Sequence, residues 1–167
     1  MLGQMMQMPP LISSILRHAA RHHGDTEIVS RRLEGDIHRY TYADCEQRSR
    51  RLASAFTKAG LASGERVATL AWNGYRHMEL YYAVAGMGSV IHTINPRLHP
   101  EQIAWIVNHA GDEILAFDVT FQPIVEAIAP HCPKVKHWIA MIDADRQPAA
   151  KATTLTLANY EQFLETG

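Results

Sequence analysis

Apolar and polar residues follow two different spacings over the first 40 residues. From 11 to 20 the apolar residues recur at helical spacing, with arginines and histidines on the other side. This pattern predicts an amphipathic helix that ends near Gly24. Two short runs within 27–40 flank Glu34-Gly35-Asp36 and predict a β-hairpin.

After the hairpin the pattern predicts alternating helices and strands. Thr41 and Asp44 have the spacing of a capping box, which predicts a helix to about Ala59. The expected strands are then 66–72, 89–94, 113–118 and 135–142, and the expected helices between them are 76–86, 100–110 and 122–129. Such alternation predicts an α/β fold, with a mostly parallel sheet covered by helices on both faces. Residues 143–156 are expected to be a mobile loop, and 157–167 a last short helix.

Composition narrows the class of protein. With 167 residues, 47% of them hydrophobic and 20% charged, the chain is typical of a globular domain. A net charge of -1 argues against a nucleic-acid-binding protein. Cys45 and Cys132 provide neither a disulfide framework nor a metal-binding spacing. The chain has no N-glycosylation sequon and no secretory signal, so we expect a cytoplasmic protein.

The N-terminal segment 1–24 has two interpretations. A transit peptide is also amphipathic and basic. A helical arm docked on the domain is favoured, because acidic Asp25 and Glu27 follow at once. The apolar run is too short for a membrane span.

The glycine and serine motifs do not match known phosphate-binding or nucleophile sites. The segment 86–91 begins like a dinucleotide fingerprint, but Ile91 stands where glycine or alanine belongs, and the segment precedes a strand. Close packing of helix and strand is therefore favoured there. No glycine is followed by lysine, so there is no Walker-type loop. Ser63 lacks the spacing of a nucleophile elbow and is interpreted as a loop residue.

Histidines and arginines are mostly expected to be structural. His18 and His22, with His23 beside them, have helical spacing for a metal, but a solvated helix face is favoured. His92 is interpreted as a histidine whose hydrogen bonds are made inside the fold. Five arginines could gather around a phosphate, but an ordinary charged surface paired with Asp44 and Glu46 is favoured for them: Arg31, Arg32, Arg48, Arg50 and Arg51. A buried core is favoured over cofactor contacts for Met78, Tyr81, Tyr82, Met87 and Trp105.

The stretch Asn95-Pro96-Arg97 is interpreted as architecture. Pro96 keeps Asn95 out of the helical region and ends the strand in a turn. Pro100 suits the first turn of the next helix. The N–H groups of a first turn have no partner within the helix, so proline, which has no N–H, loses no hydrogen bond there. We therefore assign no catalytic, cofactor-binding or metal-binding residue to the chain.

The sequence as a whole resembles a known family. The order of segments from 40 to 118, including RVATLAWN, YYAV and HTINPRL, is similar to the N-terminal part of the acyl-adenylate-forming enzymes. Within them it looks most like medium- and long-chain fatty acyl-CoA ligases, and the start MLGQMM and PKVK resemble bacterial medium-chain members.

The resemblance implies an activity for a longer protein. That family joins a fatty acid to ATP with Mg²⁺, and coenzyme A then displaces AMP. Its phosphate loop, adenine and ribose contacts and C-terminal lysine lie downstream of the matching segment. The resemblance therefore implies that 1–167 is a partial N-terminal domain, structural and inactive alone, and expected to form a homodimer or otherwise self-associate through exposed apolar surface. In a twofold dimer the amphipathic helix at 11–23 could swap or dock across the contact. The resemblance does not decide which acyl-chain length the longer protein prefers. The alternative to a ligase fragment is a self-standing α/β interaction or regulatory domain without catalysis.

Overall fold

The main sheet of the computed structural model has five parallel strands in the order β4-β3-β5-β6-β7. The structure describes residues 3, 7–149 and 155–167. The strands are β3 (Arg66–Leu70), β4 (Val90–Thr93), β5 (Ile114–Phe117), β6 (His137–Ala140) and β7 (Leu157–Asn159). The central strand β5 is buried along its whole length, as expected where helices cover both faces.

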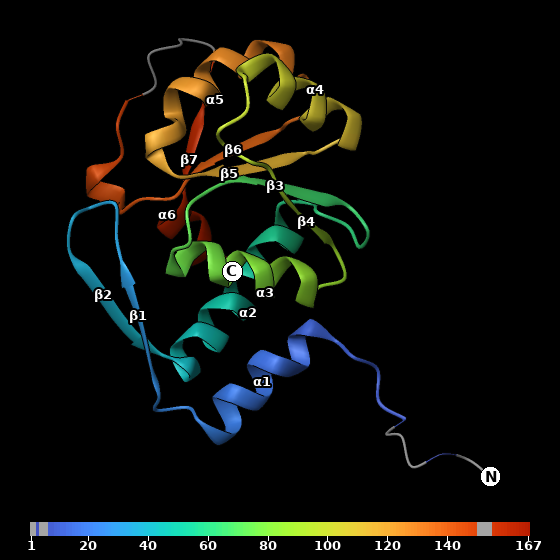
Figure 1. Cartoon of the computed structure of the whole chain (residues 1–167), viewed down its shortest axis with the longest axis vertical. Coiled ribbons are helices and arrows are strands. Elements are labelled where there is room, and N and C mark those ends of the chain that lie inside the picture. Colours follow the sequence, from blue (N-terminus) through green and yellow to red (C-terminus); the bar gives the residue numbers. More distant parts are fainter. Residues whose placement is uncertain (1–2, 4–6, 150–154) are drawn as a thin grey trace.

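Helices cover both faces of this sheet (Figure 1). On one face lie α4 (Pro100–Ala110) and α5 (Gln122–Ile128), packed on one apolar cluster. On the other face lie α2 (Tyr42–Lys58), α3 (Tyr75–Gly86) and α6 (Tyr160–Glu165), packed on a second cluster. The predicted α/β class with a helix-covered parallel sheet is confirmed.

Helix α1 (Ile12–His22) forms a further layer outside α2 and α3 (Figure 1). Its one buried residue is Leu16, which joins a small cluster with Tyr40, Cys45 and Tyr75. The antiparallel hairpin of β1 (Glu27–Arg31) and β2 (Ile37–Thr41) lies beside this cluster. The predicted helix and hairpin are thus both present.

Two helix starts follow the local chemistry of the sequence. The Thr41 side chain accepts a hydrogen bond from the Asp44 N–H, and the Asp44 carboxylate accepts one from the Thr41 N–H at 2.9 Å. This is the predicted capping box, and it fixes the first residue of α2. Pro100 occupies the first turn of α4.

The connection between β4 and α4 is a β-turn. The Leu98 N–H donates to the Asn95 carbonyl at 3.3 Å, with Pro96 at the second position. The Asn95 side chain accepts from the Arg97 N–H at 3.0 Å. These bonds match the architectural interpretation of this stretch.

The expectation of four strands is wrong, because β7 adds a fifth to the main sheet. Residues 157–159 were assigned to the last helix, but they pair with β6 in the register Trp138↔Leu157. Three residues are too few to show an alternating pattern, so tertiary pairing decides the structure here. Within the segment 143–156, a short 3-10 helix spans Ala144–Arg146, and 150–154 lie outside the described residues.

Candidate functional site

The carboxyl edge of the parallel sheet is the place where open α/β folds bind ligands. Here the segments after β3 and β5 meet. The Asp118 carboxylate accepts a hydrogen bond from the Trp72 N–H at 2.6 Å, and the Trp72 indole donates to Thr120 Oγ1 at 3.1 Å. Burial raises the pKa of Asp118 to about 6, although the Trp72 bond opposes this effect.

His77 ties the start of α3 to the same edge. Its Nδ1 lies 3.2 Å from the Trp72 carbonyl oxygen, and its Nε2 lies 3.0 Å from Thr69 Oγ1. A carbonyl only accepts, so Nδ1 carries the hydrogen and Nε2 accepts from the Thr69 hydroxyl. Burial lowers the pKa of His77, which favours this neutral ring. Both ring nitrogens are therefore occupied by bonds within the fold.

A buried arginine, Arg76, holds three carboxylates beside this edge. Its Nη1 donates to Glu34 at 2.8 Å and its Nε to Glu161 at 2.8 Å, and its Nη2 donates to Asp143. The carboxylates come from the β1–β2 turn, from α6 and from the loop after β6. Burial alone would raise the pKa of Glu34, but the bond to Arg76, a backbone hydrogen bond and the charges of Arg76 and Arg32 together outweigh burial and lower the pKa.

A second arginine extends the network to the buried side of α3. Arg48 donates to Glu79 at 2.7 Å and to Glu161 at 2.8 Å. Tyr160 also donates to Glu79 at 2.7 Å. Burial raises the pKa of the fully buried Glu79, with Arg48 and Tyr160 opposing it.

The Mg²⁺ that the family resemblance implies does not fit this edge. No group of three metal-ligating side chains occurs among the described residues. The oxygens of Asp143 and Glu161 are bound by arginines, and Asp118 is bound by a backbone N–H. The one buried carboxylate oxygen without a described partner is Glu34 Oε2, beside a cavity of about 50 Å³. That volume suits a water molecule rather than a substrate.

Other residues weighed from the sequence lie apart from this edge. His92 Nδ1 is 2.8 Å from a carboxylate oxygen of the buried Asp112, as expected for a histidine bonded inside the fold. Ser63 donates to the Gly88 carbonyl at 3.1 Å in a loop. A side chain at Gly88 would meet Ser63 Oγ at 2.9 Å, which supports close packing at this glycine. His18 and His22 are exposed on α1, with ring centroids 4.6 Å apart.

The interpretation of the arginines as a plain surface is wrong for two of them. Arg48 belongs to the network above, and Arg32 binds Asp143 at 3.0 Å across 111 residues. Arg50 does pair with Glu46, as expected. Sequence spacing reveals only neighbours along a helix, so it shows the Arg50 pair and misses partners that the fold brings in.

The expectation of a buried core is also wrong for two aromatic residues. Trp105 is 64% exposed and Tyr81 is 40% exposed, whereas Met78, Tyr82 and Met87 are partly buried against the apolar clusters. Trp105 stacks on His109 with ring centroids 4.6 Å apart. The helical period alone does not separate a core position from an exposed apolar one.

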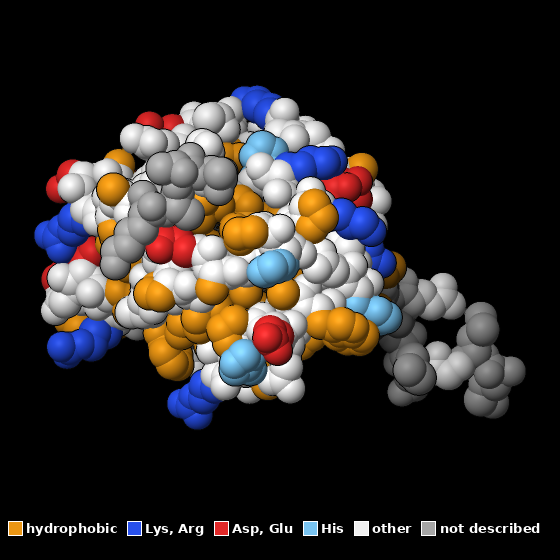
Figure 2. Space-filling model, turned by 90° about the horizontal axis from the view of Figure 1, so that it is seen from above, with side chains coloured by type: hydrophobic (Ala, Val, Ile, Leu, Met, Phe, Trp, Pro, Cys, Tyr) orange, Lys and Arg blue, Asp and Glu red, His pale blue; other side chains and the backbone are white. Residues whose placement is uncertain are grey.

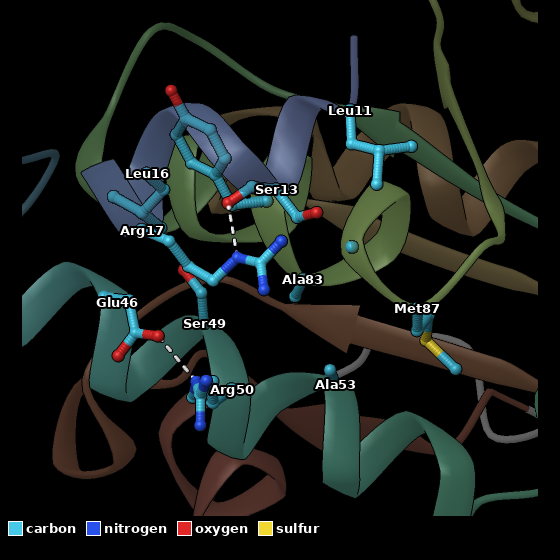
Figure 3. Close-up of a pocket in the computed structure, with 12 residues that line it drawn as sticks. Leu11, Ser13, Leu16, Arg17, Glu46, Ser49, Arg50, Ala53, Ala83 and Met87 are labelled. Carbon is cyan, nitrogen blue, oxygen red and sulfur yellow. Dashed lines mark hydrogen bonds and ion pairs between the residues drawn. The ribbon is translucent and has the colours of Figure 1, made fainter. Parts of the chain in front are cut away.

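A larger hollow lies between α1, α2 and α3 (Figure 3). It measures about 500 Å³ and is lined by Leu16 and Arg17 of α1, by Leu11 just before α1, by Ala53 of α2 and by Met87 just after α3. The acid and base that line it, Glu46 and Arg50, form an ordinary ion pair along α2. It is a groove between helices rather than an active site.

The fold and the carboxyl edge together define an open α/β scaffold with a parallel sheet. Residues 16–164 match the family model described as AMP-binding enzyme, so the chain belongs to that family. None of the described helices meets the length and hydrophobicity needed to cross a membrane.

Individual relatives are CoA ligases. The chain is 51% identical to a 3-methylmercaptopropionyl-CoA ligase of Ruegeria pomeroyi and 46% identical to a medium-chain-fatty-acid–CoA ligase of Ectopseudomonas oleovorans. Both matches cover 100% of this chain but only 31% and 30% of those proteins. The solved fatty acyl CoA synthetase of Mycobacterium tuberculosis matches with a TM-score of 0.71 at 25% identity, over 85% of this chain and 30% of that one.

Proposed function

We propose that these 167 residues are the N-terminal scaffold part of a longer ATP-dependent fatty acid–CoA ligase. The overall reaction converts a medium- or long-chain fatty acid, ATP and coenzyme A into acyl-CoA, AMP and diphosphate. The observation that carries the proposal is the match over the whole chain to CoA ligases of which it covers less than a third.

In this proposal the chain contributes no catalytic residue. The polar side chains at the carboxyl edge bind one another, so they are not free to stabilise a transferring phosphoryl group. ATP, Mg²⁺ and coenzyme A are then bound by residues outside 1–167, and 1–24 serve as a docked helical arm.

The sequence identities favour a second carboxylic acid as a candidate substrate. Identity to the 3-methylmercaptopropionyl-CoA ligase is 51%, against 46% for the medium-chain ligase. 3-Methylmercaptopropionate is therefore the second candidate substrate.

Diphosphate exchange into ATP tests this proposal. The exchange is measured with the 167-residue chain and with the longer protein, using octanoate, palmitate and 3-methylmercaptopropionate in turn. We expect acid-dependent exchange for the longer protein and none above a heat-killed control for the chain. Exchange by the chain itself would contradict the scaffold role, and a longer protein inactive with all three acids would contradict the ligase.

We also propose a cytoplasmic location and self-association. The cytoplasm supplies the ATP and coenzyme A that the ligase uses. The chain associates with a second copy through the exposed Trp105 of α4. Beside it, the partly buried Ile106 of α4 and Leu98 of the preceding turn complete the lining of a hollow of about 370 Å³. Figure 2 looks onto the face with α4 and α5, where apolar side chains lie among polar ones.

A further inference from the structure

Three histidines gather at the C-terminal end of α1. His18 and His22 are exposed one turn apart on the helix, and their ring centroids are 4.6 Å apart. His23 follows the helix, with its ring centroid 6.1 Å from that of His18. Apart from these ring contacts, the side chains of His18 and His22 have no hydrogen bond or ion pair with a described residue. Their ring nitrogens are therefore available to a ligand from solution.

The separation of the first two rings suits one metal ion between them. Zinc lies about 2.0–2.1 Å from a coordinating ring nitrogen, and hence roughly 3.2 Å from the ring centroid. Two rings that bind one ion at angles between about 90° and the tetrahedral angle then have centroids about 4.5–5.2 Å apart. The 4.6 Å between His18 and His22 falls in this range, whereas the 6.1 Å from His18 to His23 exceeds it. The described residues thus provide a pair of ligands here and not a group of three.

The position of the pair on the helix is favourable for a cation. Side chains four residues apart lie on one helix face, and the same spacing supplies both histidines of helical zinc sites. His22 is the last residue of α1, where the helix dipole has its negative end. Arg17 and Arg21 are exposed, so water and salt screen their repulsion of a bound ion. Spacing alone favoured a solvated helix face, and the rings are solvated, but only the structure places them at chelating distance.

Imidazole nitrogen selects the kind of metal. It suits Zn²⁺, Ni²⁺ and Cu²⁺, whereas Mg²⁺ and Ca²⁺ prefer oxygen ligands. Two protein ligands leave the remaining positions of the ion to water, so the site is open and its metal exchangeable. Among these divalent ions Cu²⁺ is expected to bind most tightly.

We propose that His18 and His22 chelate one divalent transition-metal ion, of the class of Zn²⁺, Ni²⁺ and Cu²⁺, across the last turn of α1. The site is separate from the Mg²⁺ and ATP of the proposed ligase reaction and does not depend on that reaction. The Gly24 carbonyl accepts a hydrogen bond from the Ala43 N–H at 3.2 Å, so this end of α1 is joined to the start of α2. A bound ion therefore stiffens the helical arm next to the point where the arm is anchored.

Titration calorimetry of the full chain, purified without a histidine tag, tests the proposal. After dialysis against EDTA and then metal-free buffer, the chlorides of Zn²⁺, Ni²⁺, Cu²⁺ and Mg²⁺ are added in separate titrations. We expect one Zn²⁺ per chain at micromolar concentrations, tighter binding of Cu²⁺ and no binding of Mg²⁺. Zn²⁺ binding only at millimolar concentrations, or none, would overturn the proposal.

Single substitutions assign the ion to the pair. His18→Gln and His22→Gln are each expected to weaken Zn²⁺ binding by at least about tenfold, because each removes one of the two ligands. His131→Gln removes an exposed histidine from the turn after α5 and is expected to leave binding unchanged. His23→Gln is the nearest control, and we expect it to weaken binding by less than about threefold. A loss for His23→Gln as large as for the pair would overturn the two-histidine chelate.

Three further readouts separate the chelate from other effects. Far-ultraviolet circular dichroism without metal should match the unchanged chain for every variant, since these histidines are exposed. Electron paramagnetic resonance of the Cu²⁺ complex should show two nitrogen ligands in the unchanged chain and one fewer in His22→Gln. Zn²⁺ should raise the melting temperature of the unchanged chain but not that of His22→Gln, because the helix holds the two rings together. If the affinity and the Cu²⁺ spectrum were the same in all variants, the ion would be bound elsewhere and the proposal would be wrong.

Discussion

Arg76 is a single side chain that joins three separate parts of the chain. It is 6% exposed and binds the carboxylates of Glu34, Asp143 and Glu161. Replacing it by methionine would leave these partly buried charges without their shared partner. Removing one partner of a buried ion pair typically lowers the free energy of unfolding by about 3–5 kcal/mol. We expect Arg76→Met to lower the free energy of unfolding by that amount in urea titrations.

The matched control for Arg76 is an exposed ion pair. Arg39 binds Glu27 at 2.9 Å with both side chains more than half exposed. Arg39→Gln should change the free energy of unfolding by less than about 0.5 kcal/mol, because surface ion pairs contribute little. If both substitutions had the same small effect, the Arg76 network would not be a source of stability.

The raised pKa of Asp118 makes the free energy of unfolding depend on pH. Its pKa rises from 3.8 to about 6 on folding, so the folded chain holds a proton that the unfolded chain has lost between these values. The contribution of the protonated carboxyl to stability is present below pH 4 and is lost as pH rises to about 6.

Asp118→Asn should remove this loss, because an amide stays neutral and its oxygen still accepts from Trp72. We expect the variant to be more stable than the original chain at pH 7 by on the order of 1–2 kcal/mol, and the difference to shrink toward pH 4. Thermal melts from pH 4 to 7 measure it. A constant difference across that range would show that the Asp118 carboxyl does not titrate there.

At the scale of elements, the turn between β4 and α4 depends on Pro96. Its fixed backbone angle suits the second position of the Asn95–Leu98 turn. Pro96→Gly frees the unfolded chain and should cost on the order of 1 kcal/mol of stability. In the longer protein we expect a lower melting temperature with turnover and substrate affinity nearly unchanged. Intact stability with lost turnover would support a catalytic role for this stretch instead.

The elements that could be predicted from sequence are those whose signals are local. The capping box at Thr41 and Pro100 in the first turn of α4 mark helix starts within four residues, and both predictions are confirmed. β7 could not be predicted, since its three residues become a strand only by pairing with β6. The same limit applies to the Arg76 network, whose partners lie 42, 67 and 85 residues away in the sequence.

At the scale of the whole molecule, exposed apolar residues on α4 predict self-association. Among the described residues Trp105 is the most exposed large hydrophobic one. Hiding such surface favours contact at about 25 cal/mol per Å², offset in part by lost motion. We expect light scattering to show a dimer that weakens on dilution, and Trp105→Lys to weaken it further. Binding of a hydrophobic dye should fall as the dimer forms.

The opposite result is informative about the class of protein. A chain that is monomeric at all concentrations and binds no hydrophobic dye would expose little usable apolar surface. That outcome would contradict the proposed self-association. It would favour the alternative of a self-standing interaction or regulatory domain.

The arrangement around Arg76 has a consequence for synthesis on the ribosome. Of its three carboxylates, only Glu34 has been made when Arg76 is added, and Glu161 follows 85 residues later. At a rate of about 5–20 residues per second, this delay is roughly 4–17 s. Until Asp143 is added, 67 residues after Arg76, the hairpin can meet Arg76 through Glu34 alone, and α6 becomes available only at the end of the delay. The nascent chain therefore waits for the third carboxylate before this part of its interior can close.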